Sequence, residues 1–196
     1  MGWSFSWDKS FKKADLIERF LRPGFFKVGV SIIDHRVVGN HFWAVLQEGE
    51  DKEIWLALME PGGHDSGWGY KSLSETCGPY EVDCPLSLLE QCTAAPNDSS
   101  AAWRKSVVEW HKAQKRLNAA KSSVAPGMKL EVSGTVYTTV RALGPRKGWV
   151  VEDEHGKHFR MPCQQIARCL SRILNNQDEA AKTAPMPSHA EQLSFI

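Results

Sequence analysis

Apolar positions near the start of the chain recur at three- and four-residue steps. This spacing predicts a short amphipathic helix over residues 10–22. The members of the stripe are Phe11, Ala14, Ile17 and Leu21, flanked by Leu16 and Phe20. Pro23 and Gly24 follow. They predict the end of the helix, because proline cannot continue the backbone hydrogen-bond ladder and glycine tolerates a chain reversal.

The pattern then changes to apolar runs of strand length. These runs cover residues 25–33, 40–47 and 53–59. The polar segments between them, 34–39 and 48–52, are short enough for antiparallel hairpins, which predicts a meander with one face covered by the helix. Residues 61–70 contain four glycines, so we expect a loop or a distorted edge strand there.

A longer helical pattern follows over residues 101–121. Its apolar stripe consists of Trp103, Val107, Trp110 and Leu117, and Asp98–Ser100 offers N-caps. The rest of this helix surface is mainly basic. We therefore expect an α+β domain over residues 1–122 that ends in a long basic amphipathic helix.

Short alternating runs separated by turn residues dominate the next part of the chain. They lie at residues 128–132, 135–143, 148–152 and 157–161. Several short strands within about forty residues are typical of a small SH3-like β-barrel, which we place at residues 126–174. Residues 175–196 contain little that could be buried, so we expect a disordered tail.

Charge is divided between the two halves of the sequence. Residues 1–100 carry 9 Lys/Arg and 15 Asp/Glu, whereas residues 101–196 carry 15 Lys/Arg and 8 Asp/Glu, although the whole chain has a net charge of only +1. No apolar run approaches the ~20 residues that a membrane-spanning helix needs, so we expect no membrane partner. The division indicates two modules with different partners, or two halves that partly neutralise each other.

Candidate catalytic chemistry is confined to the segment Gly62–Pro79. Cys77 lies near Glu75 and His64 in the sequence, and a cysteine beside a histidine and an acid can form an activated thiolate. A chain with 5 Cys and 7 His offers such groupings by chance. The common hydrolase, phosphate-loop and metalloprotease motifs are absent. The cysteines lack the paired spacing of structural zinc ligands, so we expect neither a metal nor another cofactor.

Nucleic-acid binding is the main alternative to catalysis, because basic helices attract phosphates and small barrels can present a groove. The candidate contacts share a position in the basic second half. They are Arg104, Lys105, Lys112, Lys115, Arg116, Arg146 and Lys147. Aromatic residues such as Trp149 and Phe159 are interleaved and could stack on bases. The competing interpretation is a solvated helix face with the aromatic rings in the core.

Three stretches of the N-terminal half are distinctive. They are the opening Met1–Phe5, the segment Gly69–Pro79, which reads Gly-Tyr-Lys-Ser-Leu-Ser-Glu-Thr-Cys-Gly-Pro, and the pair Cys84-Pro85. Together they resemble a protein family of phages, plasmids and integrative elements that has no established activity. The resemblance covers roughly residues 1–115. It implies an accessory role on a mobile element and a bacterial cytoplasmic setting.

From these patterns we expect a non-catalytic accessory protein of a phage or mobile element that binds a nucleic-acid or nucleoprotein target through its basic half. Two alternatives stay open. One is an inhibitor of a host defence protein that acts by protein–protein binding alone. The other is a small enzyme with a site at Gly62–Pro79. The sequence leaves the oligomeric state open.

Overall fold

The computed structural model describes residues 2–144 and 147–170. The chain forms two compact units, which divide between Lys112 and Ala113. The charge division follows the units: residues 1–112 carry 12 Lys/Arg and 16 Asp/Glu, and residues 113–196 carry 12 Lys/Arg and 7 Asp/Glu. We describe each unit by itself.

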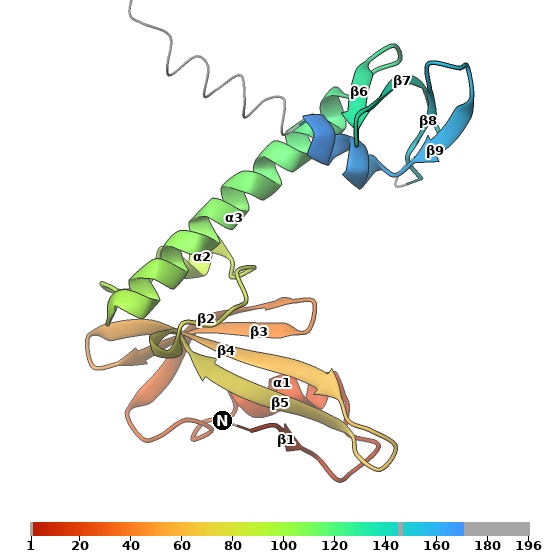
Figure 1. Cartoon of the computed structure of the whole chain (residues 1–196). Helices are drawn as coiled ribbons and strands as arrows, with labels where there is room; N and C mark the ends of the chain where they lie inside the picture. The colour runs from red at the N-terminus through yellow and green to blue at the C-terminus, as the bar shows by residue number, and fades with distance from the viewer. Residues whose placement is uncertain (1, 145–146, 171–196) are drawn as a thin grey trace, which may run out of the picture. The chain divides into compact units, whose positions relative to one another are not determined.

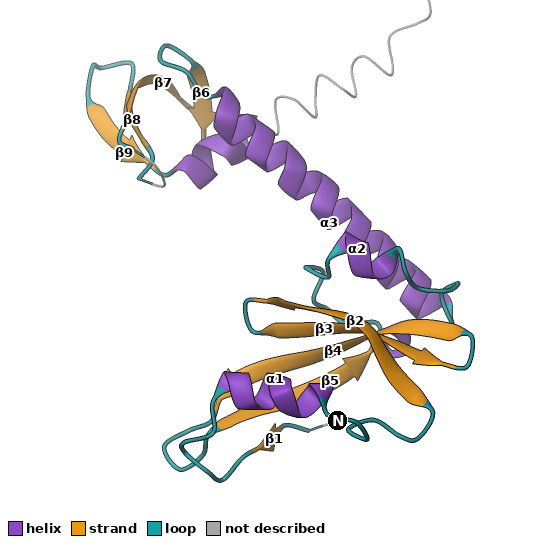
Figure 2. Ribbon diagram, turned by 180° about the vertical axis from the view of Figure 1, so that it is seen from behind, coloured by secondary structure: helices purple, strands orange, loops and turns teal. Residues whose placement is uncertain are grey.

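Unit 1 is built on a five-stranded antiparallel sheet, which we call sheet A, with the order β1-β5-β4-β3-β2. Figure 1 shows the strands and Figure 2 the helices beside them. The strands are β1 Ser4–Phe5, β2 Val30–Val38, β3 His41–Glu48, β4 Asp51–Pro61 and β5 Trp68–Ser74. The helices that precede sheet B in the described part of the chain are α1 Lys13–Leu21, the 3-10 turn η1 Glu75–Cys77, α2 Leu86–Leu89 and α3 Asp98–Ser123. The predicted α+β class and the antiparallel meander are confirmed.

Both faces of sheet A are covered. On one face Phe42 and Trp55 pack with Leu16 and Phe20 of α1. On the other face lies a second core, whose members are Trp43, Val45, Ile54, Leu56, Cys84, Leu88, Trp103 and Val107. The apolar side of α1 is therefore centred on Leu16 and Phe20, not on the predicted stripe, since Leu21 is 42% exposed.

The first predicted strand is wrong in position. Residues 25–33 are aromatic and β-branched, but Phe25 and Phe26 precede β2 and contribute to the core from a loop. Residues 34–38, predicted to be a polar connection, belong to β2. The two-residue turn Gly39–Asn40 makes the hairpin to β3. Gly39 has a φ of 57°, a conformation that glycine adopts at little cost in such turns.

Unit 2 contains a four-stranded antiparallel meander, which we call sheet B, with the order β6-β7-β8-β9. Its strands are β6 Lys129–Val132, β7 Thr135–Ala142, β8 Trp149–Glu152 and β9 His158–Met161. Residues 163–170 are helical. The pairings of the described residues do not join β9 to β6, so the closed barrel of the prediction is not found. The predicted disordered tail lies outside the described residues.

In the part of the chain that the structure describes, no helix has the length and apolar character needed to cross a membrane.

Candidate nucleic-acid interface

Among the described residues, a hydrophobic core covers one face of sheet B. Leu130, Val151 and Met161 are buried there and pack with Ile166 and Leu170 of the C-terminal helical segment. Side chains alternate between the faces of a strand, so the residues between these core positions point to the opposite face. That outer face carries most of the polar side chains of the sheet.

Two arginines form a cross-strand row on the outer face. Arg141 of β7 pairs with Val150 of β8, and Val150 pairs with Arg160 of β9. Directly paired residues share a face, and neighbouring strands lie about 4.8 Å apart, so the two arginines flank Val150 two strands apart. Both arginines are exposed. This row is the densest arrangement of positive charge that the register of sheet B defines.

A lysine lies at the same end of the sheet. Lys147 belongs to the β7–β8 turn, and its carbonyl oxygen accepts a hydrogen bond of 3.0 Å from Nε of Arg160. The bond fixes the direction of the Arg160 side chain while its terminal nitrogens stay available for an anion. We call Arg141, Lys147 and Arg160 the basic row.

An exposed aromatic ring of β9 lies beside a further cation, from the residue that precedes the strand. Phe159 is 37% exposed, its ring meets that of Tyr137 edge-on at 5.9 Å, and Nζ of Lys157 lies 5.3 Å from its centroid. A ring with a cation beside it can take a stacked base. Phe159 pairs directly with the buried Val151, so its ring belongs to the covered face of sheet B and not to the face of the two arginines. The use of this ring as a stacking surface stays a prediction.

The predicted contacts on α3 divide between the units. Lys105 and Lys112 belong to unit 1, and Lys115 and Arg116 belong to unit 2. All four are exposed. Lys112 forms an ion pair of 2.8 Å with Glu109, and an exposed pair of this kind is weak. The remaining predicted contact, Arg146, lies outside the described residues.

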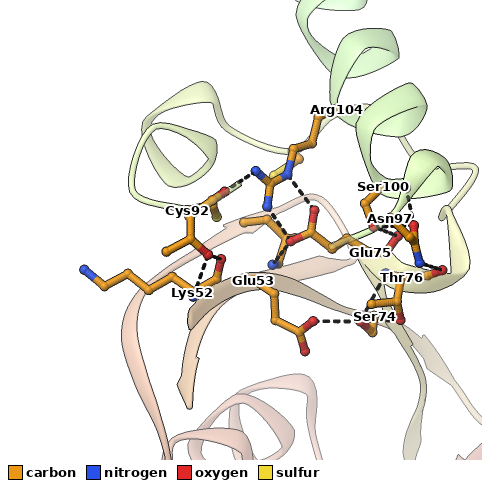
Figure 3. A network of polar contacts seen from close by, with 12 residues as sticks. Lys52, Glu53, Ser74, Glu75, Thr76, Cys92, Asn97, Ser100 and Arg104 are labelled. Atoms are coloured by element: carbon orange, nitrogen blue, oxygen red, sulfur yellow. Dashed lines mark hydrogen bonds and ion pairs between the residues drawn. The ribbon is translucent and has the colours of Figure 1, made fainter. Parts of the chain in front are cut away.

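Arg104 has a structural role instead of a free guanidinium. Its Nε and Nη2 donate to the two carboxylate oxygens of Glu75 at 2.6 and 2.8 Å, and its Nη1 donates to the carbonyl oxygen of Thr93 at 2.6 Å (Figure 3). The side chain of Glu75 is fully buried, and that of Arg104 is 17% exposed. With three of its five donors used inside the protein, Arg104 is a poor candidate for a phosphate contact.

Glu75 connects three segments of unit 1. Its Oε1 also accepts the backbone N–H of Ile54 at 2.8 Å, and its carbonyl oxygen accepts the hydroxyl of Ser100 at 3.0 Å. The residue therefore joins η1 to β4 and to α3, as Figure 3 shows. A carboxylate that is buried and held by these donors cannot reach a substrate, so the geometry removes Glu75 from the catalytic candidates.

The other two catalytic candidates lie far apart. His64 is 95% exposed in the β4–β5 loop, whereas Cys77 lies beyond the far end of β5. At about 3.3 Å per residue, the seven residues of β5 separate them by roughly 20 Å. A cavity of about 400 Å³ beside Cys77 is lined by residues such as Gly78, Tyr80 and Trp103 and has no histidine or carboxylate in its lining.

The buried cysteines are weak nucleophiles. Burial raises the pKa of Cys84, and burial also raises the pKa of Cys92 to about 11. Both thiols are therefore protonated near neutral pH, and the thiolate is the reactive and metal-binding form. Among the described residues, no group of three or more His, Cys, Asp or Glu side chains is placed to hold a metal ion.

Sequence reasoning missed a histidine–aspartate pair in unit 1. Nδ1 of His41 lies 2.8 and 2.9 Å from the two carboxylate oxygens of Asp83, and both side chains are partly exposed. The residues are 42 positions apart, so no local motif could reveal them. The pair joins β3 to the segment before α2, which is a structural role.

Comparison of the chain with models of protein families, with curated proteins and with solved structures finds no match.

Proposed function

We propose that the chain is a non-catalytic accessory protein of a phage or other mobile element that binds nucleic acid through the outer face of sheet B, in the bacterial cytoplasm. The basic row is the single observation that carries the proposal. The described strands of unit 2 would serve as a small SH3-like platform, with one face for the core and one for the ligand. The setting rests on the sequence resemblance alone.

The charge and geometry of unit 2 support phosphate as the ligand. Backbone pairing fixes the Cα positions of Arg141 and Arg160 on either side of β8, so little backbone entropy is lost when they engage an anion. Guanidinium groups also match the geometry of phosphate oxygens. Contacts of this kind give affinity without base specificity.

The experiment measures binding of labelled single- and double-stranded DNA and RNA by fluorescence anisotropy over a salt series. The triple variant Arg141→Glu/Lys147→Glu/Arg160→Glu should lose more than about tenfold in affinity at low salt. The slope of log affinity against log salt should fall by about 3, because each lost phosphate contact contributes about one counterion.

A charge-matched variant separates the basic row from net charge. Lys9→Glu/Arg19→Glu/Lys27→Glu makes the same change in net charge in unit 1, at three exposed positions. It should bind almost as the wild type does. Equal loss in both variants would reduce the proposal to a net-charge effect, and equal binding by the wild type and the basic-row variant would exclude this face.

Binding to a host protein alone is the second candidate, and exposed aromatic residues of unit 1 favour it. Trp7 is 86% exposed and Tyr80 is 97% exposed, and tryptophan and tyrosine are enriched among residues that dominate protein interfaces. Capture of a host protein from nuclease-treated lysate, lost on Trp7→Ala or Tyr80→Ala and kept in the basic-row variant, would favour this candidate.

A further inference from the structure

The strand β2 forms an open edge of sheet A. Its only strand neighbour among the described residues is β3. Edge strands pair readily with another strand, and proteins commonly protect them with proline, charges or a covering element. β2 contains no proline, and two of its apolar side chains are exposed, Ile33 at 44% and Val37 at 41%.

The alternation of the hairpin shows which backbone groups face outward. The turn Gly39–Asn40 has two residues, so its flanking pair, Val38 and His41, is a hydrogen-bonded pair. Hydrogen-bonded and non-hydrogen-bonded pairs alternate along the hairpin. The third pair beyond the flanking pair, His35 with Ala44, is therefore a non-hydrogen-bonded pair. The N–H and C=O of His35 therefore point to the open edge.

Side chains of the neighbouring residues now cover these two groups. The N–H of His35 donates to Oδ1 of Asp34 at 2.7 Å, and Nη1 of Arg36 donates to the carbonyl oxygen of His35 at 2.7 Å. Asp34 and Arg36 also form an ion pair with each other. The outward backbone groups of His35 are thus satisfied by side chains of β2 itself and, among the described residues, not by the backbone of another strand.

The sequence of the edge is self-complementary in the antiparallel direction. Residues 34–36 read Asp-His-Arg, so a twofold axis at His35 places Asp34 opposite the partner's Arg36 on both sides of the axis. Moving the axis by one residue would place Arg36, or Asp34, opposite its own copy, which is destabilising. β2 has an irregularity between Ile32 and Asp34, so its regular pairing runs from Asp34 to Val38, and only the register centred on His35 pairs opposite charges within that stretch.

We propose that β2 is a homodimerisation edge, which pairs antiparallel with β2 of a second copy about a twofold axis at His35. The two His35 residues then exchange N–H···O=C bonds, and Asp34 and Arg36 turn from their own strand to the partner's. This isologous pairing joins two copies of sheet A into one continuous sheet. The proposal is independent of nucleic-acid binding, because it uses no residue of unit 2.

Two charge variants test the register. Asp34→Arg leaves two arginines per strand and Arg36→Asp leaves two aspartates, so each variant alone brings like charges together at both positions. Mixed, the two variants restore opposite charges at both positions. One pair of edge strands buries a small area, and interfaces of that size are weak and transient. Analytical ultracentrifugation over about 1–300 µM is therefore the suitable measurement. We expect the average mass of the wild type to rise above the 22.0 kDa of the monomer as the concentration increases. Each variant alone should stay monomeric, and the mixture should dimerise.

A second pair of variants tests the dimer edge without changing Asp34, which also accepts a hydrogen bond from Gln91. Val37→Lys introduces a charge within the edge, whereas Val28→Lys makes the same change at a fully exposed residue before β2. Circular dichroism checks the fold of each. Val37→Lys should abolish dimerisation and Val28→Lys should not. A wild type that stays monomeric over the whole range, or a dimer that survives Val37→Lys and Asp34→Arg, would overturn the proposal.

Discussion

The two sheets of this protein differ in the number of faces that hydrophobic cores cover. Sheet A has one core with α1 on one face and a second core with α2 and the start of α3 on the other. Sheet B has, among the described residues, one core, on the face that meets the C-terminal helical segment. A sheet covered on both faces can offer a partner only its edges and loops, whereas a sheet covered on one face offers its whole second face.

Arginine shows the same difference at the level of single residues. Arg104 of unit 1 donates to a buried carboxylate and a backbone carbonyl, so its charge is used to hold secondary-structure elements together. Arg160 of unit 2 is exposed and donates to the carbonyl oxygen of Lys147. The residue type is the same, but only the second arginine presents its charge to solvent.

The largest expected effect tests the buried pair. Glu75→Gln leaves the guanidinium of Arg104 without its counter-charge in a site that is mostly buried, so the free energy of unfolding should fall by about 3–5 kcal/mol. Urea unfolding of the full chain, followed by tryptophan fluorescence, measures the change. The double variant Glu75→Leu/Arg104→Met should recover much of the loss, because no unpaired charge is left behind.

The control for this prediction is an exposed ion pair on α3. Glu109→Gln removes the partner of Lys112, and both side chains are 58% exposed, so the loss should stay below about 1 kcal/mol. A loss for Glu75→Gln as small as that for Glu109→Gln would show that the buried pair does not organise unit 1.

Sequence reasoning located the strands of sheet B and, in sheet A, β3 and β4. It did not locate β1 or β5, which is an inner strand and not the predicted loop or edge strand, nor the pairs between distant residues. Glu75 was predicted to be a catalytic acid and Arg104 a phosphate contact. Their pairing was missed because 29 residues separate them and no periodicity connects them. Their buried pairing depends on how η1 packs against α3. The position of β2 was missed for another reason: an edge strand tolerates polar residues such as Asp34 and Arg36 that a central strand would exclude.

The basic row depends on register, which composition does not contain. Lys147 was predicted from the basic turn, but Arg141 and Arg160 were not. Arg141 pairs with Val150 only because an irregularity between Thr139 and Arg141 shifts the register of β7 against β8. Without that extra residue, the side chain of Arg141 would face the core side of sheet B.

A smaller effect is expected from the turn that carries Lys147. Gly148 has a φ of +93°, and an added Cβ would lie 2.3 Å from the carbonyl oxygen of Met161. Gly148→Ala should therefore destabilise unit 2 by about 1–3 kcal/mol from backbone strain, with a further cost from the clash, and should weaken nucleic-acid binding. Hydrogen exchange of β7–β9 amides and the anisotropy assay measure the two effects.

The matched control is the turn between β8 and β9. Gly156 has a φ of +77°, but an added Cβ there would meet no atom nearer than 3.5 Å. Gly156→Ala should show the strain of the positive φ without the clash, and it should leave the basic row in place. If both alanine variants lost the same stability and the same affinity, the close approach of Gly148 to β9 would have no role in placing Lys147.

The smallest expected effect concerns a half-buried carboxyl group of sheet A. Burial, and next the nearby carboxylate of Glu75, raise the pKa of Glu53 above its usual value. The folded chain therefore binds this proton more tightly than the unfolded chain does. Stability from this group is fully present below the unfolded pKa and is lost as the pH rises through the folded pKa.

Glu53→Gln removes this pH dependence. The variant should be slightly more stable than the wild type at pH 7, and the difference should shrink as the pH falls below the ordinary glutamate pKa of about 4.3. Urea unfolding between pH 4 and 8 measures it. Glu48→Gln is the control, because Glu48 is exposed and paired with Lys27, so its loss should leave stability at pH 7 unchanged or slightly lower. A Glu53→Gln variant that is less stable at pH 7 would mean that the hydroxyl of Ser74, which donates to Glu53 at 3.4 Å, outweighs burial and the repulsion from Glu75.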